Sequence, residues 1–195
     1  MAITPIVVRE WIADLSTTGL SPATVRKAYS VLRRILEVAV ESDVWARNPC
    51  AGVKAPAESR REMRFLTPDE VATLAEAMDP RYRALVLLAC YGGLRWGELA
   101  ALRRARVDAL RRSVVVVEQV QELDDGTQSW GPPKSAAGRR TVPLPRFVSD
   151  ALADHIGEWA LPGADGLVFP SPHGAVLRNG LFHRRFWAPA ISRAG

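Results

Sequence analysis

The chain has 195 residues, enough for one large domain or two small ones with at least one hydrophobic core. Lys and Arg total 26 against 21 Asp and Glu, and this net charge of +5 favours a polyanionic partner. No uncharged apolar run reaches the roughly 18 residues of a membrane span, and Arg9, Glu10 and Asp14 interrupt the start, where a signal peptide would be apolar. We therefore expect a cytoplasmic protein with no membrane partner.

Two amphipathic helices are predicted at the start of the chain. Thr4 and Pro5 form a cap and a first-turn proline, and apolar residues then recur at helical spacing until Gly19. Ser21 and Pro22 repeat this start signal before a longer helix with one apolar face. Basic residues lie largely off that face: Arg26, Lys27, Arg33 and Arg34.

The helical periodicity stops between residues 43 and 64. Asn48-Pro49, Gly52 and Pro56 are typical of extended chain, and a basic cluster follows them. We predict a helical domain at 1–47, a basic linker at 48–64 and a second domain at 65–195.

The second domain is predicted to begin with helices. Thr67 and Pro68 start one of them, and Pro80 starts another whose centre, residues 84–90, is apolar all round, as in a domain core. Tyr91-Gly92-Gly93 ends that helix, and a short helix is expected at 96–102.

The pattern then changes to strands and returns to helix. Residues 114–117 are β-branched, 124–126 form a hairpin turn signal, and 140–144 read as a further short strand. Helices are expected at 146–159 and from 179 to about 188, with an extended piece at 167–169. The order predicts a mainly α protein with a small antiparallel β-sheet, in the α+β class.

The cysteines and histidines predict no metal or disulfide. Cys50 and Cys90 lie far apart without CxxC spacing, so we expect both to be buried small apolar residues. His155, His173 and His183 form no ligand pattern such as HExxH. We therefore predict no metal and no other cofactor.

Three boxes carry a resemblance to a known family. Residues 89–99, ACYGGLRWGEL, resemble the first catalytic box of the tyrosine-type site-specific DNA recombinases, the phage integrase family, in which a Gly-Leu-Arg turn leads into a helix bearing an acid. Residues 20–25, LSPATV, and Asn48-Pro49 are similar to the core-binding domain of integrases and its end. Residues 133–135 and 138–144, PKS and GRRTVPL, are similar to the family's lysine-bearing β-hairpin.

The resemblance covers nearly the whole chain. It implies a partial integrase-like catalytic domain at 65–195, preceded by a partial, SAM-like helical core-binding domain at 1–47. It also implies the family reaction, in which a tyrosine oxygen attacks a DNA phosphate and the phosphotyrosyl bond is later reversed without ATP. Double-stranded DNA is then the expected partner, with other recombinase protomers as further partners.

Within this family Arg95 is expected to bind the scissile phosphate. A planar guanidinium can hold two non-bridging oxygens as negative charge gathers in the transition state. The alternative is an arginine that only pairs with Glu98, three residues further along a helix. We expect Glu98 to orient Arg95 or the local backbone rather than to transfer protons.

Lys134 is the candidate proton donor to the leaving 5′-oxygen, because an arginine is too weak an acid for that task. A solvated turn lysine is the alternative. The other basic residues are expected to contact the DNA backbone, with the linker crossing the duplex in a C-shaped grip, or to be solvated. They are Arg26, Lys27, Arg33, Arg34, Arg60, Arg61, Arg64, Arg139, Arg140, Arg184 and Arg185.

Two family features do not occur in these residues. The His-x-x-Arg box is missing, since Phe186 follows three places after His183, and no tyrosine occurs after Tyr91. We expect a chain cut at both ends that binds DNA but does not cleave it alone. A non-catalytic regulator or dominant-negative partner of a full-length recombinase is the alternative, and a helical interaction module with solvated basic faces is a third.

Overall fold

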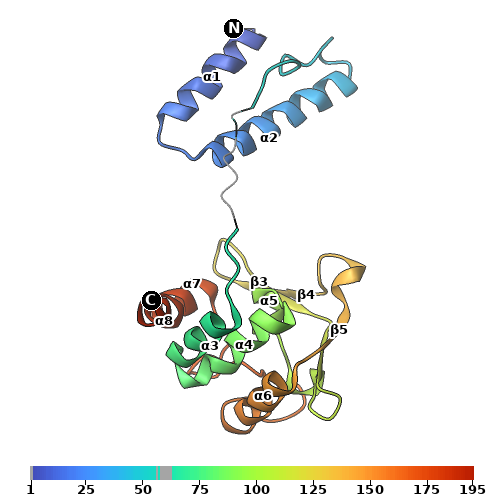
Figure 1. Cartoon of the computed structure of the whole chain (residues 1–195). Helices are drawn as coiled ribbons and strands as arrows, with labels where there is room; N and C mark the ends of the chain where they lie inside the picture. The colour runs from blue at the N-terminus through green and yellow to red at the C-terminus, as the bar shows by residue number, and fades with distance from the viewer. Residues whose placement is uncertain (1, 56, 58–62) are drawn as a thin grey trace. The chain divides into compact units, whose positions relative to one another are not determined.

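The computed structural model describes residues 2–55, 57 and 63–195, and the chain divides into two compact units, Met1–Arg64 and Phe65–Gly195 (Figure 1). No helix within these ranges has the length and apolar character that a membrane crossing requires. Each unit has its own hydrophobic core and is described by itself.

The first unit contains two helices, α1 (Pro5–Thr17) and α2 (Pro22–Glu41). Thr4 caps α1 through a hydrogen bond from the Val7 amide to its hydroxyl, and Ser21 caps α2 in the same way. Because each cap is followed by a proline at the first helical position, both helices start where the sequence predicts.

The core of the first unit extends beyond its helices. Cys50 and Val53 are buried against Val8 of α1 and against Tyr29 and Leu36 of α2. The Tyr29 hydroxyl lies 3.1 Å from the Cys50 carbonyl oxygen and 2.8 Å from that of Val53. The sequence predicts a linker from residue 48. The start of this segment is packed against the first unit, because Tyr29 of α2 donates hydrogen bonds to its backbone carbonyls.

Helices are the main regular elements of the second unit (Figure 1). Five consecutive residues of α4, from Ala84 to Leu88, are buried, which confirms the helix predicted to be apolar all round. Cys90, near the end of α4, is exposed, so its predicted burial is wrong; it lies beyond the buried stretch of the helix. The α-helices are α3 (Pro68–Ala77), α4 (Arg83–Gly92), α5 (Trp96–Ala100), α6 (Arg146–Glu158), α7 (Asn179–Phe182) and α8 (Ala188–Ala194).

Shorter helical turns join these elements. Three are 3-10 turns, and the π-helical turn η4 makes α7 and α8 nearly continuous. They are η1 (Pro80–Tyr82), η2 (Arg104–Arg106), η3 (Ala136–Gly138) and η4 (His183–Trp187).

The strands of the second unit form two small antiparallel sheets, where the sequence suggested one. The first has the order β1 (Val107–Asp108), β2 (Ser113–Val116), β5 (Arg140–Pro143), and the second is the hairpin of β3 (Gln119–Glu122) and β4 (Gln128–Gly131). Between β2 and β3, Glu118 pairs with Arg103 at 2.7 Å, so the chain leaves the first sheet there.

The core of the second unit is aromatic on one side. Tyr82 is fully buried, its ring meets Phe182 and Phe186 edge-on, and its hydroxyl donates to the Pro170 carbonyl at 3.2 Å. These contacts hold the C-terminal helices against α3 and α4.

Candidate phosphate-binding site

The turn between α4 and α5 places Arg95 at the start of a helix. Gly93 ends α4 with φ +61°, a left-handed conformation that glycine adopts without strain, and its amide donates to the Ala89 carbonyl at 3.1 Å. Leu94 then points into the core, and Arg95 becomes the N-terminal cap residue of α5. The turn thereby directs consecutive side chains in different directions.

The Glu98 carboxylate contacts both the backbone amide and the guanidinium of Arg95. Its side chain has no exposed surface; Oε2 accepts from the Arg95 amide at 2.9 Å and Oε1 lies 3.3 Å from Arg95 Nη1. The Arg95 side chain nevertheless remains 69% exposed. The ion pair of the alternative reading therefore exists, but it leaves much of the guanidinium facing solvent.

Arg140 of β5 binds the same carboxylate. Its Nη2 lies 2.9 Å from Glu98 Oε2, and its Nη1 lies 3.2 Å from Oε1. Its nitrogens also donate to the carbonyls of Gly93, at 3.2 Å, and Gly138, at 3.1 Å. The sequence assigns Arg140 to the DNA backbone, yet the structure aims its guanidinium at four protein oxygens.

The charge of Glu98 depends on these two arginines. Burial opposes ionisation, but the hydrogen bonds from Arg140 and from the Arg95 amide outweigh it, so the pKa of Glu98 lies below its ordinary value. The pKa of Arg140 is raised, chiefly by its hydrogen bond to Glu98. The ionised form of Glu98 is therefore favoured between the two guanidinium groups.

Lys134 lies just after β4 and is exposed. It lines a cavity of about 370 Å³ together with Trp96, Gln121, Gln128 and Asn179, among others. Trp96 is the residue next to Arg95, so the predicted proton donor and the neighbour of the predicted phosphate ligand face one cavity. The structure thus brings together two boxes that lie almost 40 positions apart in the sequence.

A close approach fixes this arrangement. A Cβ atom added to Gly97 of α5 would overlap the carbonyl oxygen of Val120 in β3. Because only a glycine tolerates this contact, the β3–β4 hairpin can lie directly against α5. No local pattern predicts the contact of Gly97 with Val120 or the pairing of Arg140 with Glu98, since both join segments far apart in the chain.

The remaining basic residues of the prediction differ in their surroundings. On α2, Arg33 pairs with Glu37 at 3.0 Å and Arg34 with Glu41 at 3.1 Å. All four basic residues of the set on this helix, Arg26, Lys27, Arg33 and Arg34, are exposed. Arg60 and Arg61 lie outside the described residues. Four further members of the set are exposed: Arg64, Arg139, Arg184 and Arg185.

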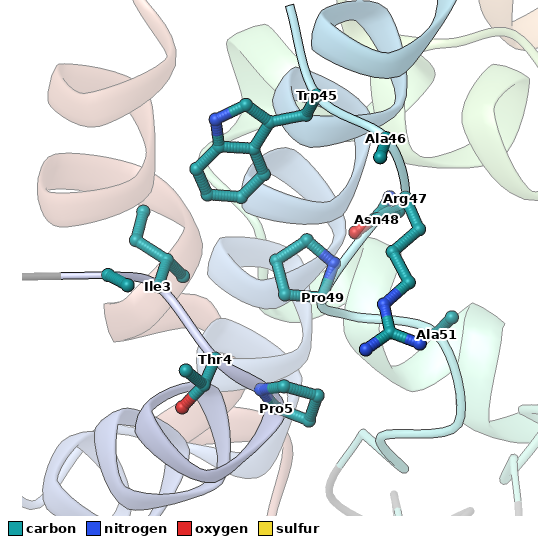
Figure 2. Close-up of a pocket in the computed structure, with 10 residues that line it drawn as sticks. Ile3, Thr4, Pro5, Trp45, Ala46, Arg47, Asn48, Pro49 and Ala51 are labelled. Carbon is teal, nitrogen blue, oxygen red and sulfur yellow. The ribbon is translucent and has the colours of Figure 1, made fainter.

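A second cavity, of about 540 Å³, belongs to the first unit (Figure 2). Figure 2 shows Trp45 and Pro49 beside Ile3 and Pro5, and Arg47 is the one charged residue among those that line it. With no titratable group other than Arg47 in its lining, this cavity has no acid–base or nucleophilic chemistry to offer.

The three tyrosines lie in different surroundings. Tyr29 and Tyr82 are buried with their hydroxyls bonded to backbone carbonyls, and burial raises the pKa of Tyr82 to about 12. Tyr91 stands near the end of α4, where its ring packs edge-on against Phe147 while the side chain remains partly exposed.

Comparisons with known proteins agree with the resemblance, although no protein-family model matches the chain. The prophage phiRv2 integrase of Mycobacterium tuberculosis is 36% identical over 172 residues, which cover 87% of this chain and 44% of that protein. The integrase of Mycobacterium phage FRAT1 is 30% identical over 186 residues, covering 93% and 55%. The chain thus spans about half the length of these curated relatives.

Solved structures share the fold. The Tn1549 transposon integrase, in complex with a circular intermediate DNA, superposes with a TM-score of 0.80 over 94% of this chain and 63% of that one, at 20% identity. A lambda integrase dimer bound to a core site gives 0.68 over 99% and 66%, also at 20% identity. The relatives named integrase or tyrosine recombinase and these structural neighbours support the resemblance of the chain to the phage integrase family of tyrosine-type site-specific recombinases.

Proposed function

We propose that this chain binds double-stranded DNA and supplies the Arg95 and Lys134 part of a site that cleaves and rejoins DNA in site-specific recombination. The observation that carries the proposal is an exposed guanidinium, that of Arg95, fixed at a helix start by a fully buried carboxylate. The names of the relatives, integrases and a recombinase, and the DNA complexes of the structural neighbours support the same direction.

Arg95 has the chemistry of a phosphate ligand. Among the residues that the structure describes, Glu98 engages Nη1 of Arg95, and the exposed side chain leaves Nη2 and Nε to donate to phosphate oxygens. Such preorganised donors act on charge that develops in the transition state, and losing one typically raises the barrier by about 2.7–4 kcal/mol. The buried partner fixes the donor before DNA arrives.

Lys134 is proposed as the proton donor to the 5′-oxygen that leaves when the strand is cut. Its ammonium can give up a proton, which the guanidinium of an arginine does not do at neutral pH. It lines the same cavity as Trp96, the residue that follows Arg95. A positioned acid of this kind contributes roughly a hundredfold to ten-thousandfold in rate.

The cleavage step needs a tyrosine that these residues do not provide, since Tyr29, Tyr82 and Tyr91 are engaged in packing. The proposal is therefore that the chain as given binds DNA without forming a covalent adduct. The 1–47 and 65–195 regions would act as the helical and catalytic parts of the DNA grip, joined by the basic segment 48–64.

The test is duplex binding at graded salt concentrations. We expect the chain to bind a fluorescent 30-base-pair duplex with an affinity that falls steeply with salt, because phosphate contacts release counterions. Arg95→Ala should weaken binding and reduce the salt slope by about one phosphate contact. Arg111→Ala is the charge-matched control, since Arg111 is exposed at the β1–β2 turn and outside the proposed set.

Three results would count against the proposal. Equal losses in Arg95→Ala and Arg111→Ala would mean that Arg95 contributes only general charge. A protein–DNA adduct that survives denaturation on a nicked attachment-site duplex would contradict the claim that this chain does not cleave alone. Binding that does not respond to salt would remove the phosphate contacts altogether.

A second candidate function is a non-catalytic regulator or dominant-negative partner of a full-length recombinase, and the packing of all three tyrosines favours it. Arg95→Ala separates the two in a strand-exchange assay with a full-length relative. A regulator that only occupies sites should lose little of its effect, whereas a protomer completed in trans should lose strand exchange almost entirely.

A further inference from the structure

Arg140 makes four side-chain hydrogen bonds in the segments around Arg95 and Lys134. Its two terminal nitrogens contact both carboxylate oxygens of Glu98 and the carbonyls of Gly93 and Gly138. A guanidinium carries five N–H donors in a rigid plane, so one side chain can satisfy several acceptors at fixed angles. Its side chain is 30% exposed, so much of it is enclosed by these partners.

Two of these acceptors belong to the segment of Arg95. Gly93 precedes it by two residues, and Glu98 binds both its amide and its guanidinium. Arg140 donates hydrogen bonds to the Gly93 carbonyl and to the Glu98 carboxylate. It thereby restrains the chain on both sides of Arg95. The carboxylate between the two arginines transmits this restraint directly.

The other acceptor belongs to the segment of Lys134. Gly138 ends the turn η3, and its amide donates to the Ser135 carbonyl at 2.9 Å. A Cβ atom on Gly138 would overlap the side chain of Pro133, which is directly before Lys134. The 133–138 loop is therefore compact, and a bond to the Gly138 carbonyl restrains the loop that carries Lys134.

We propose that Arg140 is a positioning residue that ties the Arg95 turn to the Lys134 loop and so sets the spacing of the two proposed catalytic cations. This inference rests on the proposed function of Arg95 and Lys134. It replaces the expectation that Arg140 contacts the DNA backbone. The low pKa of Glu98 supports it, because an anion at the centre of the cluster keeps both guanidiniums in place.

Arg139 provides a matched control. It is the preceding residue, carries the same charge and is exposed, whereas Arg140 turns inward. Arg139 lies directly before β5, so the two substitutions Arg139→Gln and Arg140→Gln remove the same charged group from neighbouring positions, and only the second removes the contacts to Glu98, Gly93 and Gly138. Only the second should disturb Arg95.

The first measurement is amide hydrogen exchange followed by NMR, without DNA. Arg140→Gln should accelerate exchange at the amides of Arg95 and Gly138 by at least tenfold, while the buried Val168 amide, bonded to the Leu102 carbonyl, stays unchanged. Arg139→Gln should change none of them. Uniform acceleration at all amides, or none at Arg95, would overturn the proposal.

Arg140→Lys tests whether the planar guanidinium with its two terminal nitrogens is needed. A lysine keeps the charge but has one compact ammonium, which cannot reach Glu98, Gly93 and Gly138 at once. We expect exchange at Arg95 to remain fast in this variant. Full recovery to the rate of the unaltered protein would refute the role of the planar guanidinium.

The second measurement is a double-mutant cycle on duplex binding. If Arg140 acts through Arg95, then Arg95→Ala combined with Arg140→Gln should bind no more weakly than Arg95→Ala alone, with the same salt slope. If Arg140 contacts phosphate directly, the two losses should add, and the slope should fall again. Additive losses would therefore contradict the inference.

The two proposals can fail separately. Amide exchange is measured without DNA, so a negative result there leaves the phosphate role of Arg95 untouched, and a failure of DNA binding leaves the restraint by Arg140 untouched. Should Arg140→Gln not fold, the unaltered protein still gives an answer. Separate, slowly exchanging Nη signals are expected for Arg140, and a single averaged signal would overturn the proposal.

Discussion

The contact between α5 and β3 makes a sharp prediction for Gly97→Ala. The added Cβ would overlap the Val120 carbonyl oxygen, a backbone atom held in the β3–β4 ladder that cannot rotate away. Overpacking of this kind costs about 1–3 kcal/mol, against a gain of roughly 0.5–1 kcal/mol from replacing a helical glycine. We expect a net loss of about 1–2 kcal/mol and, at about 3 °C per kcal/mol, a Tm lower by roughly 3–6 °C.

Gly157→Ala is the control for this prediction. Gly157 lies in α6, and a Cβ there would meet nothing within 4 Å, so the same substitution should raise Tm by about 2 °C. Calorimetry of both variants gives the comparison. A rise in Tm for Gly97→Ala as large as that for Gly157→Ala would refute the close approach and, with it, the placing of the hairpin against the Arg95 helix.

Further predictions concern buried polar groups of the second unit. Glu98→Gln should lower the free energy of unfolding by about 2 kcal/mol in urea titrations, since charge-assisted hydrogen bonds to two arginines are lost. Buried His155, which bonds to the Val168 carbonyl and has Arg81 and Glu158 as charged neighbours, has a pKa lowered chiefly by burial. The unfolded chain therefore binds the extra proton first, and stability is full above pH about 6.5 and falls by up to about 1.4 kcal/mol for each pH unit below it. His155→Gln should remove this slope between pH 5 and 7, and an unchanged slope would mean that another group titrates. Tyr82→Phe should lower stability by about 1 kcal/mol through the lost bond to Pro170 and leave duplex affinity unchanged; a large loss of affinity would show that the ring packing account is incomplete.

Local signals in the sequence were strong enough to place most helices. Thr4, Ser21 and Thr67 each begin a helix in the structure, because a side-chain oxygen and a following proline satisfy the free helix start regardless of the rest of the fold. The apolar run of α4 likewise predicts burial by itself, because no face of that helix is suited to water.

Other features depend on contacts between segments far apart in the chain, and these were not predicted. The predicted burial of Cys50 is confirmed, but the sequence assigns Cys50 and Val53 to a linker without periodicity. Their packing against the Tyr29 hydroxyl of α2 is seen only in the structure. Cys90 follows a buried run yet reaches the surface. The strands form two sheets, and Glu118, between β2 and β3, pairs with Arg103. No local pattern in the sequence predicts this division or this ion pair.

By itself, the sequence determined the class of the fold, the turn that presents Arg95 and the family that these residues resemble. Only the tertiary structure decided that Glu98 is shared between Arg95 and Arg140, which lies 42 residues away from it, and that Arg140 faces the protein. The physical reason is the sequence separation over which each interaction acts. Caps, turns and periodicity act within a few residues, whereas the partner of a buried charge is chosen by the packing of the whole unit.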